Sequence, residues 1–371
     1  MITSDRSARV HRGENGTDPL PSGLRLNEIQ FMATHNSSHQ LMPPDERFTW
    51  LMGSNLDSYR YEHLPLDRQL GEQAVRGLEL DLYPDPQGGL YRHPLARRWR
   101  RRGPRPESLW DEPGFKVMHG PDADYRTSCP TLAGALQTIS AWSTSNPGHV
   151  PIVVQLELKG SWPWARLTGG ARVPRWTTTV LDDLDREIRA VFADHRIITP
   201  DRVRGDAETL EDAVLTSGWP PLDDVRGHVM FFLDYGDNTY VRDNYRAGRP
   251  SLEGRVAFTT PPPAETDSAF IMVNDPRGAN GAHITDLVRR GYLVRTRSDD
   301  PVSTAKANQH NRVAAALDSG AHMISTDFPQ PGLAFRWGDG EFRAQLPGGV
   351  PVRVNPSVVT GVGPGQVSSR P

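Results

Sequence analysis

Residues suited to metal binding and proton transfer follow several short apolar runs of this chain. They are His35, Asn36, Glu79, Asp81, His119, Glu157 and Lys159. Carboxylate and amide oxygens bind hard cations such as Ca²⁺ and Mg²⁺, and imidazole exchanges protons near neutral pH. The ends of parallel barrel strands meet at one pocket. The sequence therefore predicts one site that binds a divalent cation and moves protons.

The acidic pair Glu79 and Asp81 gives the clearest pattern. Residues two apart on a strand point to the same face, and two buried carboxylates repel each other. A cation must offset that repulsion. With Asn36 and Glu157, the pair offers four oxygen-bearing side chains, and we interpret the set as a metal site. The alternative is a salt-bridge cluster with nearby cations, namely Arg76, Lys159 or Arg297.

The two histidines, His35 and His119, each follow a different predicted strand. One imidazole can take a proton from an attacking hydroxyl while the other protonates a leaving oxygen, as phosphodiester cleavage requires. Either ring suits either role. At the end of the last predicted strand, Ser325 and Asp327 are expected to line the pocket, or Asp327 to cap a turn.

Cationic and aromatic side chains are predicted near the same mouth. Lys159 is expected to contact a substrate phosphate or to pair with a carboxylate, and Arg295 and Arg297 have the same alternatives. Trp162 and Trp164 follow in a loop. We expect these indoles to insert into a lipid interface, stack on a sugar ring, or pack on a neighbouring loop.

Strands that alternate with helices must position these residues. The expected strands are 29–33, 77–83, 115–118, 151–158, 228–233, 269–273, 292–296 and 323–326. The expected helices are 66–75, 131–143, 177–194, 284–290 and 303–317. Eight strands in this alternation predict an α/β protein with a distorted (β/α)₈ TIM barrel in a single domain. The gap between 233 and 269 shows no clear helix, so we expect the barrel to be irregular there.

Three segments follow from this pattern. We expect a disordered leader over residues 1–23, a catalytic barrel over 24–328, and a Gly/Pro-rich tail over 329–371 that packs on the barrel. The leader lacks the apolar core of an export signal, and no run reaches the ~18 apolar residues of a membrane span. We therefore expect a soluble chain without a signal peptide, which leaves its compartment open.

Composition narrows the function classes. The 371 residues are 36 % hydrophobic and 23 % charged, with a net charge of −3, which argues against a nucleic-acid binder. A single cysteine, Cys129, excludes an intrachain disulfide and a multi-cysteine zinc site. Arginines cluster locally at 97–102, either as a solvated loop or as a contact for anionic lipid head groups.

Several motifs in chain order resemble those of the bacterial calcium-dependent phosphoinositide-specific phospholipase C family, within the barrel phosphodiesterases. The resemblance runs from about residue 24 to 330. Its segments are 32–37 (MATHNS), 76–81 (RGLELD), 117–120 (VMHG), 127–132 (TSCPTL), 146–149 (NPGH), 154–159 (VQLELK), 294–299 (VRTRSD) and 324–327 (ISTD).

The resemblance implies a distorted barrel with His35 and His119 as the acid/base pair. It implies calcium, rather than magnesium, held by Asn36, Glu79, Asp81 and Glu157, and a lysine, Lys159, on the substrate phosphate. The implied reaction begins with attack of the inositol 2-hydroxyl on phosphorus. Diacylglycerol leaves, and a 1,2-cyclic inositol phosphate forms, which can then be hydrolysed to inositol phosphate. Two departures are the missing signal peptide, since relatives are often secreted, and the Arg-rich insertion at 95–106.

Other functions remain in view. A glycerophosphodiester or sphingolipid phosphodiesterase would use the same kind of barrel, and only a substrate hydroxyl beside the phosphate allows a cyclic product. A non-catalytic lipid- or phosphate-binding module would be favoured if either histidine were replaced. A sugar-processing barrel would use the paired carboxylates, but two histidines and a lysine suit phosphate better. Transient contact with a membrane surface fits the phospholipase interpretation.

Overall fold

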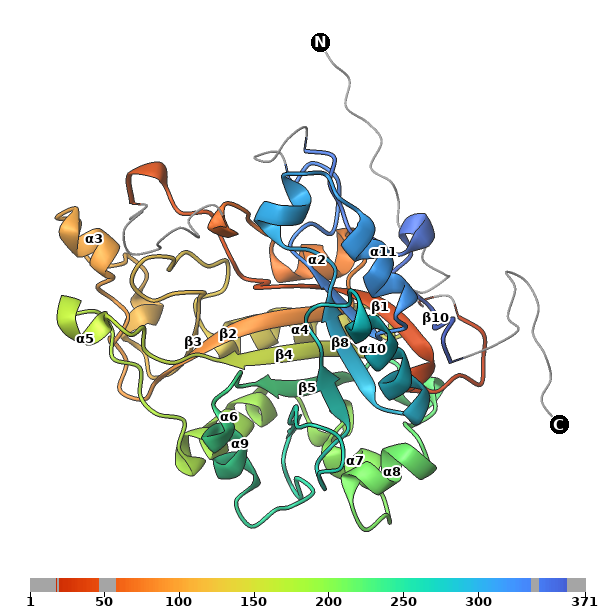
Figure 1. Ribbon diagram of the computed structural model, residues 1–371. Helices are drawn as coiled ribbons and strands as arrows, with labels where there is room; N and C mark the ends of the chain where they lie inside the picture. The colour runs from red at the N-terminus through yellow and green to blue at the C-terminus, as the bar shows by residue number, and fades with distance from the viewer. Residues whose placement is uncertain (1–17, 19, 47–57, 335–339, 359–371) are drawn as a thin grey trace.

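A curved sheet forms the centre of the molecule (Figure 1). The computed structural model describes residue 18 and residues 20–46, 58–334 and 340–358. The strands are β1 (Ile29–Thr34), β2 (Gly77–Asp85), β3 (Gly114–Val117), β4 (Ile152–Leu158), β5 (Val229–Asp234), β6 (Ala257–Phe258), β7 (Phe270–Met272), β8 (Leu293–Arg297), β9 (Met323–Thr326) and β10 (Val352–Val354).

Eight of these strands form a nearly closed parallel barrel in the order β6-β5-β4-β2-β1-β9-β8-β7. Among the residues described, no ladder joins β6 to β7, so the barrel is open at that seam. The predicted α/β class and distorted TIM-like barrel are thus confirmed.

Helices cover the outside of the barrel. They are α2 (Leu66–Glu72), α3 (Leu95–Trp99), α4 (Leu132–Ser145), α5 (Ala165–Thr168), α6 (Thr178–Val191), α7 (Pro200–Arg204), α8 (Leu210–Thr216), α9 (Thr239–Arg246), α10 (Ala279–Arg290) and α11 (Asn311–Asp318). Threonine hydroxyls cap the first turns of α4 and α6, and each helix buries one apolar face. No described helix has the length and apolar character needed to cross a bilayer.

Two predicted elements were wrong. The run Phe115–Met118 is not a barrel strand, because β3 pairs antiparallel with β2. The eighth barrel strand is instead β6, and it lies with α9 in the gap where no clear helix was expected. The helix predicted over 303–317 begins only at Asn311, after a π-helical turn at Pro301–Ala305.

Strand β2 shows how the barrel brings polar groups inside. All nine of its residues are buried. Alternate positions face opposite sides, so Leu78, Leu80 and Leu82 share one face and Glu79 and Asp81 the other. The three leucines belong to the main apolar core. The carboxylates therefore lie on the face opposite that apolar layer.

Segments near both chain ends contact the barrel. β10 pairs antiparallel with the first half of β1, and Phe342 and Leu346 join the core. Asp18 is buried and accepts a hydrogen bond from Arg76 Nε at 2.7 Å. Most of the leader predicted at 1–23, and residues 335–339 and 359–371 of the predicted tail, lie outside the described residues.

Candidate active site

Three carboxylates gather inside the barrel, on the side where the parallel strands end. Glu79 and Asp81 come from β2 and Glu157 from β4, with Asp81 and Glu157 as register partners. One oxygen from each lies within 4.8 Å of the others. Glu79 and Asp81 are buried and Glu157 is half-buried. This spacing brings the three predicted acidic ligands close enough together to share one cation.

The predicted neutral ligand, Asn36, lies beside them. Ser37 N donates to Glu79 O at 2.8 Å, and Glu79 N donates to Ser37 Oγ at 2.7 Å, which ties the end of β1 to β2. Asn36 has a left-handed backbone (φ 46°), and its Nδ2 donates to Tyr61 Oη at 2.7 Å.

Several buried oxygens of this group lack a hydrogen-bond donor. Among the described residues, Asn36 Oδ1 and Asp81 Oδ2 have no hydrogen-bond partner, whereas Asp81 Oδ1 faces the ammonium group of Lys159. Buried acceptors are normally satisfied, and Ca²⁺ takes six to eight such oxygens. The donor set therefore fits a hard divalent cation.

Two cations already approach the acidic group. Lys159 Nζ lies 2.6 Å from Glu157 Oε1 and 3.1 Å from Asp81 Oδ1. Arg295 Nη2 lies 2.8 Å from Glu79 Oε2. The expected lysine–carboxylate contact is therefore present, and Arg295 completes part of the salt-bridge alternative.

Two of the three carboxyl groups keep a raised pKa despite these cations. Burial raises the pKa of Glu79 to about 8, with Glu157 and Asp234 adding to the effect against Arg295. Burial also raises the pKa of Asp81 well above its usual range, although Lys159 opposes the rise. Carboxyl groups held this far from their ordinary pKa gain most from an added cation. A metal ion and the two basic side chains are thus compatible partners of one site.

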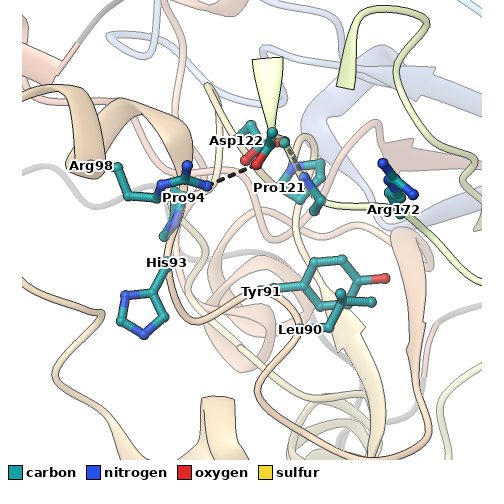
Figure 2. A pocket seen from close by; sticks show the side chains of 11 residues that line it. Leu90, Tyr91, His93, Pro94, Arg98, Pro121, Asp122 and Arg172 are labelled. Carbon is teal, nitrogen blue, oxygen red and sulfur yellow. Dashed lines mark hydrogen bonds between the residues drawn. The ribbon is translucent and has the colours of Figure 1, made fainter. Parts of the chain in front are cut away.

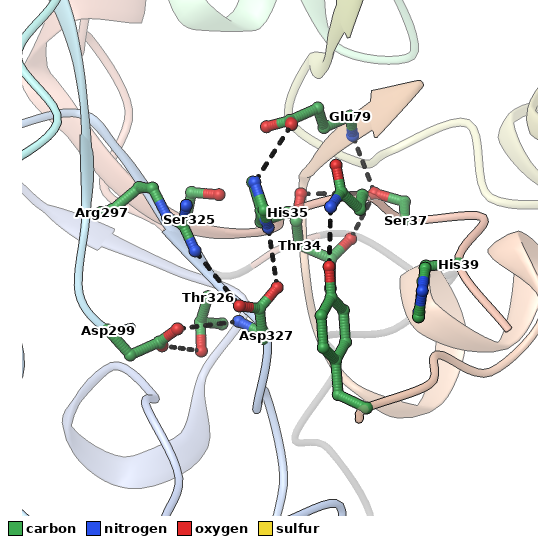
Figure 3. A network of polar contacts seen from close by, with 12 residues as sticks. Thr34, His35, Ser37, His39, Glu79, Arg297, Asp299, Ser325, Thr326 and Asp327 are labelled. Atoms are coloured by element: carbon green, nitrogen blue, oxygen red, sulfur yellow. Dashed lines mark hydrogen bonds and ion pairs between the residues drawn. The ribbon is translucent and has the colours of Figure 1, made fainter. Parts of the chain in front are cut away.

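His35 lies between two carboxylates (Figure 3). Its Nδ1 is 2.8 Å from Asp327 Oδ1, and its Nε2 is 3.6 Å from Glu79 Oε1. Because an ionised carboxylate only accepts, the Asp327 contact places the ring proton on Nδ1. Burial, followed by Arg297 and Arg295, lowers the pKa of His35 well below its usual value.

His119 is held beside the same acidic group. Met118 N donates to Asp81 O at 3.1 Å, so the antiparallel β3 places the next residue beside the middle of β2. His119 Nδ1 is 2.8 Å from Asp124 Oδ2. Burial lowers the pKa of His119, and Asp124 offsets part of that effect. Both predicted histidines therefore stand at one end of the barrel, each with a carboxylate on Nδ1.

Sequence reasoning missed two buried members of this site. Asp124 accepts hydrogen bonds from both His119 and His39, and His39 received no role from its sequence context. The available signal was spacing: His39 follows His35 by four residues, and Asp124 follows His119 by five. Asp327, for which pocket lining and turn capping were both expected, contacts His35 and Arg297.

The remaining predicted substrate contacts have protein partners. Arg297 Nη2 lies 3.1 Å from Asp327 Oδ2. Trp162 and Trp164 make an edge-to-face contact at 4.7 Å and pack, half-buried, around Ala123. A Cβ on Gly120 would come within 2.5 Å of the Trp162 ring, so only glycine permits this approach.

A cavity of about 350 Å³ opens beside the loop that carries Asp124 (Figure 2). Its wall includes Leu90, Tyr91, Arg98 and Arg172. Asp122 also lines the cavity, and its carboxylate accepts a hydrogen bond from Ala171 N at 2.8 Å. The acidic ligands do not line this cavity, so it is a separate recess on the same side of the barrel.

Comparisons with known proteins agree with this geometry. The model of a family described as phosphoinositide phospholipase C, Ca²⁺-dependent, matches residues 24–356. Curated protein sequences gave no match.

Two solved enzymes share the fold. The calcium-dependent phosphoinositol-specific phospholipase C of Pseudomonas sp. aligns over 92 % of this chain and 98 % of its own, with 16 % identity and a TM-score of 0.54. A second structure of that enzyme, a myo-inositol complex, aligns over 93 % and 100 %, with the same identity and TM-score. The Ca²⁺-dependent phosphatidylinositol-specific phospholipase C of Streptomyces antibioticus aligns over 82 % and 95 %, with 18 % identity and a TM-score of 0.52.

Proposed function

Because the chain belongs to the Ca²⁺-dependent phosphoinositide phospholipase C family, we propose that it cleaves phosphatidylinositol-type lipids through a 1,2-cyclic inositol phosphate. The carrying observation is the pair of imidazoles at one barrel end, each with Nδ1 on a buried carboxylate. The barrel over residues 24–328 is the proposed catalytic unit. The myo-inositol complex of the Pseudomonas relative supports an inositol head group.

The reaction needs two proton transfers. One imidazole takes the proton of the inositol 2-hydroxyl as its oxygen bonds to phosphorus. The bond from phosphorus to the diacylglycerol oxygen breaks, and the other imidazole protonates that oxygen. Since Asp327 and Asp124 hold the Nδ1 protons of His35 and His119, each Nε2 is left to exchange the reacting proton.

Calcium is the cofactor of this family. Asn36, Glu79, Asp81 and Glu157 would hold it. When bound, it supplies positive charge that lowers the pKa of a nearby hydroxyl and screens the phosphate.

We propose that basic side chains contact the substrate phosphate. Lys159 is the first candidate because its side chain, 18 % exposed, reaches from the rim into the acidic group. Arg297 is the second candidate, because Arg297 and His35 both contact the carboxylate of Asp327. From the sequence, both residues were expected to contact either the phosphate or a carboxylate, and their ion pairs favour the charged form of each side chain.

A transient contact with an anionic membrane surface completes the proposal. Helices α3 and α5 lie beyond the ends of β2 and β4 (Figure 1). They present Leu167, which is 88 % exposed, and Trp99, which is 37 % exposed. Arg98 and Arg172 flank the neighbouring cavity. Apolar side chains ringed by arginines suit a lipid surface.

Phosphorus NMR of the products from phosphatidylinositol tests the function. We expect a cyclic phosphate signal that appears only with Ca²⁺ and vanishes with a chelator. Glycerophosphoinositol and sphingomyelin serve as comparison substrates. Faster turnover of sphingomyelin, or cleavage of either inositol substrate in which the cyclic phosphate never forms, would favour a different phosphodiesterase reaction.

A further inference from the structure

A single carboxylate oxygen connects two histidines at the site. Asp124 Oδ2 lies 2.8 Å from His119 Nδ1 and 2.9 Å from His39 Nε2. The two rings are nearly perpendicular, with centroids 6.0 Å apart. Asp124 and His39 are both buried. Water therefore has little access to the carboxylate, and the two imidazoles are its side-chain partners in the described structure.

The backbone fixes His39 where it stands. Its N–H donates to Asn36 O at 2.8 Å, and its carbonyl accepts from His63 N at 3.1 Å. Its ring stacks on Tyr61, with centroids 4.5 Å apart. An imidazole held by two backbone bonds and a stacking partner has a defined direction. It can therefore impose that direction on the carboxylate it contacts.

The loop that carries Asp124 needs such a constraint. Residues 120 and 124 exchange two backbone hydrogen bonds, Gly120 N to Asp124 O at 2.9 Å and the reverse at 3.2 Å. This closes the loop, but it leaves the side chain of Asp124 free to rotate about its own χ angles. In the structure, the Asp124 side chain is held from outside the loop by His39.

We propose that His39 is a positioning residue for His119: by binding Asp124 Oδ2, it orients the carboxylate that fixes the tautomer and direction of the His119 ring. This inference rests on the proposed function of His119. His39 does not touch the reacting atoms. It acts as the outer partner of an acid/base group, by analogy with the outer partners of metal-binding histidines, whose loss typically costs about 10- to 100-fold in activity.

The charge of Asp124 suits this role. Burial alone would raise its pKa, but His39 and His119 together hold the pKa of Asp124 well below its usual range. The carboxylate therefore stays ionised at neutral pH. An ionised carboxylate has enough lone pairs to accept from two imidazoles at once.

Two variants of His39 distinguish a positioning role of its hydrogen bond from a general effect on protein stability. His39→Leu removes the hydrogen bond and keeps an apolar side chain against Tyr61, whereas His39→Gln keeps an N–H donor near the position of Nε2. We expect kcat to fall about 10- to 100-fold in His39→Leu with KM nearly unchanged, and to recover in large part in His39→Gln. His149→Gln is the matched control. His149 is equally buried but lies before β4, at the opposite end of the barrel.

The tautomer of His119 provides a readout that needs no substrate. Nitrogen NMR of the ring should show the proton on Nδ1 in the wild type and in His39→Gln. It should show a mixture of Nδ1–H and Nε2–H in His39→Leu. This measurement stands even if the lipid substrate is misassigned, so failure of the positioning inference is distinguishable from failure of the proposed function.

A double-mutant cycle with Asp124→Asn measures whether His39 acts through Asp124. If His39 acts through Asp124, the double variant His39→Leu/Asp124→Asn should be no slower than Asp124→Asn alone. Additive losses would overturn the inference, as would a wild-type His119 tautomer in His39→Leu. A His39→Leu protein that loses turnover only in proportion to its lost folded fraction would overturn it too.

Discussion

Asp81 on β2 and Glu157 on β4 are direct partners across a parallel ladder, and Lys159 Nζ lies within 3.1 Å of both carboxylates. Two acids at neighbouring positions of adjacent strands, both on the polar face, are costly unless positive charge offsets them. The lysine offsets one charge. Asp81 Oδ2 has no hydrogen-bond partner among the described residues, so it can still serve as a ligand for a divalent ion.

Asp81→Asn should weaken Ca²⁺ binding roughly 10- to 100-fold, because it removes one anionic ligand and keeps the shape of the side chain. The metal-free protein should lose little stability, since the substitution also relieves crowding with Glu157. Calorimetric Ca²⁺ titration and the Ca²⁺-dependent rise in Tm measure both effects.

Asp185→Asn is a matched control, because Asp185 is also a buried carboxyl but contacts Tyr245 and Arg255 on the helical layer. It should leave the Ca²⁺ titration unchanged. A wild-type titration for Asp81→Asn would remove Asp81 from the ligand set.

His35→Ala and His119→Ala should each lower kcat by about 10²–10⁴-fold, because each removes a proton-transfer group. Neither histidine belongs to the main apolar core, so the Tm should change far less than turnover does. Steady-state rates on phosphatidylinositol vesicles, with circular dichroism of each variant, provide the comparison. If either variant retains wild-type turnover, that histidine is not part of the acid/base pair.

The sequence predicted the strands that carry the acidic ligands because β2 and β4 are long and almost wholly apolar outside their ligand positions. It misplaced one barrel strand because a short run such as Phe115–Met118, with three apolar residues and a lysine, fits a parallel or an antiparallel strand equally well. β6 has two residues, Ala257 and Phe258, too few to show a period.

The site residues on strands could likewise be predicted from the sequence, whereas those in loops could not. His35 and Glu79 were predicted because chemistry-bearing residues directly follow or occupy apolar strands. His39 and Asp124 were missed because both lie in loops, where no periodicity indicates which way a side chain points. Their contact joins residues 85 apart in sequence, and backbone hydrogen bonds between residues 38–40 and 126–128 bring the two loops together.

Asp327→Asn should lower kcat by about 10²–10⁴-fold while leaving the His35 ring in place. The amide of the new side chain can donate to Nδ1, which would move the imidazole proton to Nε2, the atom expected to react. Arg297→Met removes the ion pair between Arg297 and Asp327 but leaves the proton on Nδ1 of His35. The kcat of Arg297→Met should therefore fall less than that of Asp327→Asn.

Arg297→Met and Asp327→Asn should differ in their effect on KM. Loss of a phosphate contact in Arg297→Met should raise KM, whereas Asp327→Asn should act mainly on kcat. Nitrogen NMR of His35 reports its tautomer directly. An Asp327→Asn enzyme with wild-type kcat, or with the proton still on Nδ1, would contradict the role given to Asp327.

The pH dependence of stability should show the buried histidine His322. Burial lowers its pKa to about 4 from an ordinary 6.5, and its ring bonds the backbone of Asn27 and Val294. Between these values the unfolded chain binds more protons than the folded one. The free energy of unfolding should therefore fall as pH drops from 6.5 to 4, by about 1.4 kcal/mol per pH unit from this group, and should not depend on it above 6.5.

His322→Gln isolates that contribution. The variant should be less stable than the wild type at pH 8, because its backbone hydrogen bonds are weakened, yet its stability should depend less steeply on pH between 6.5 and 4. Urea unfolding at several pH values gives both slopes. His63 and His149, also buried with a pKa lowered to about 4, remain in both proteins and cancel in the difference. Parallel slopes for variant and wild type would show that the His322 ring is protonated equally in the folded and unfolded states.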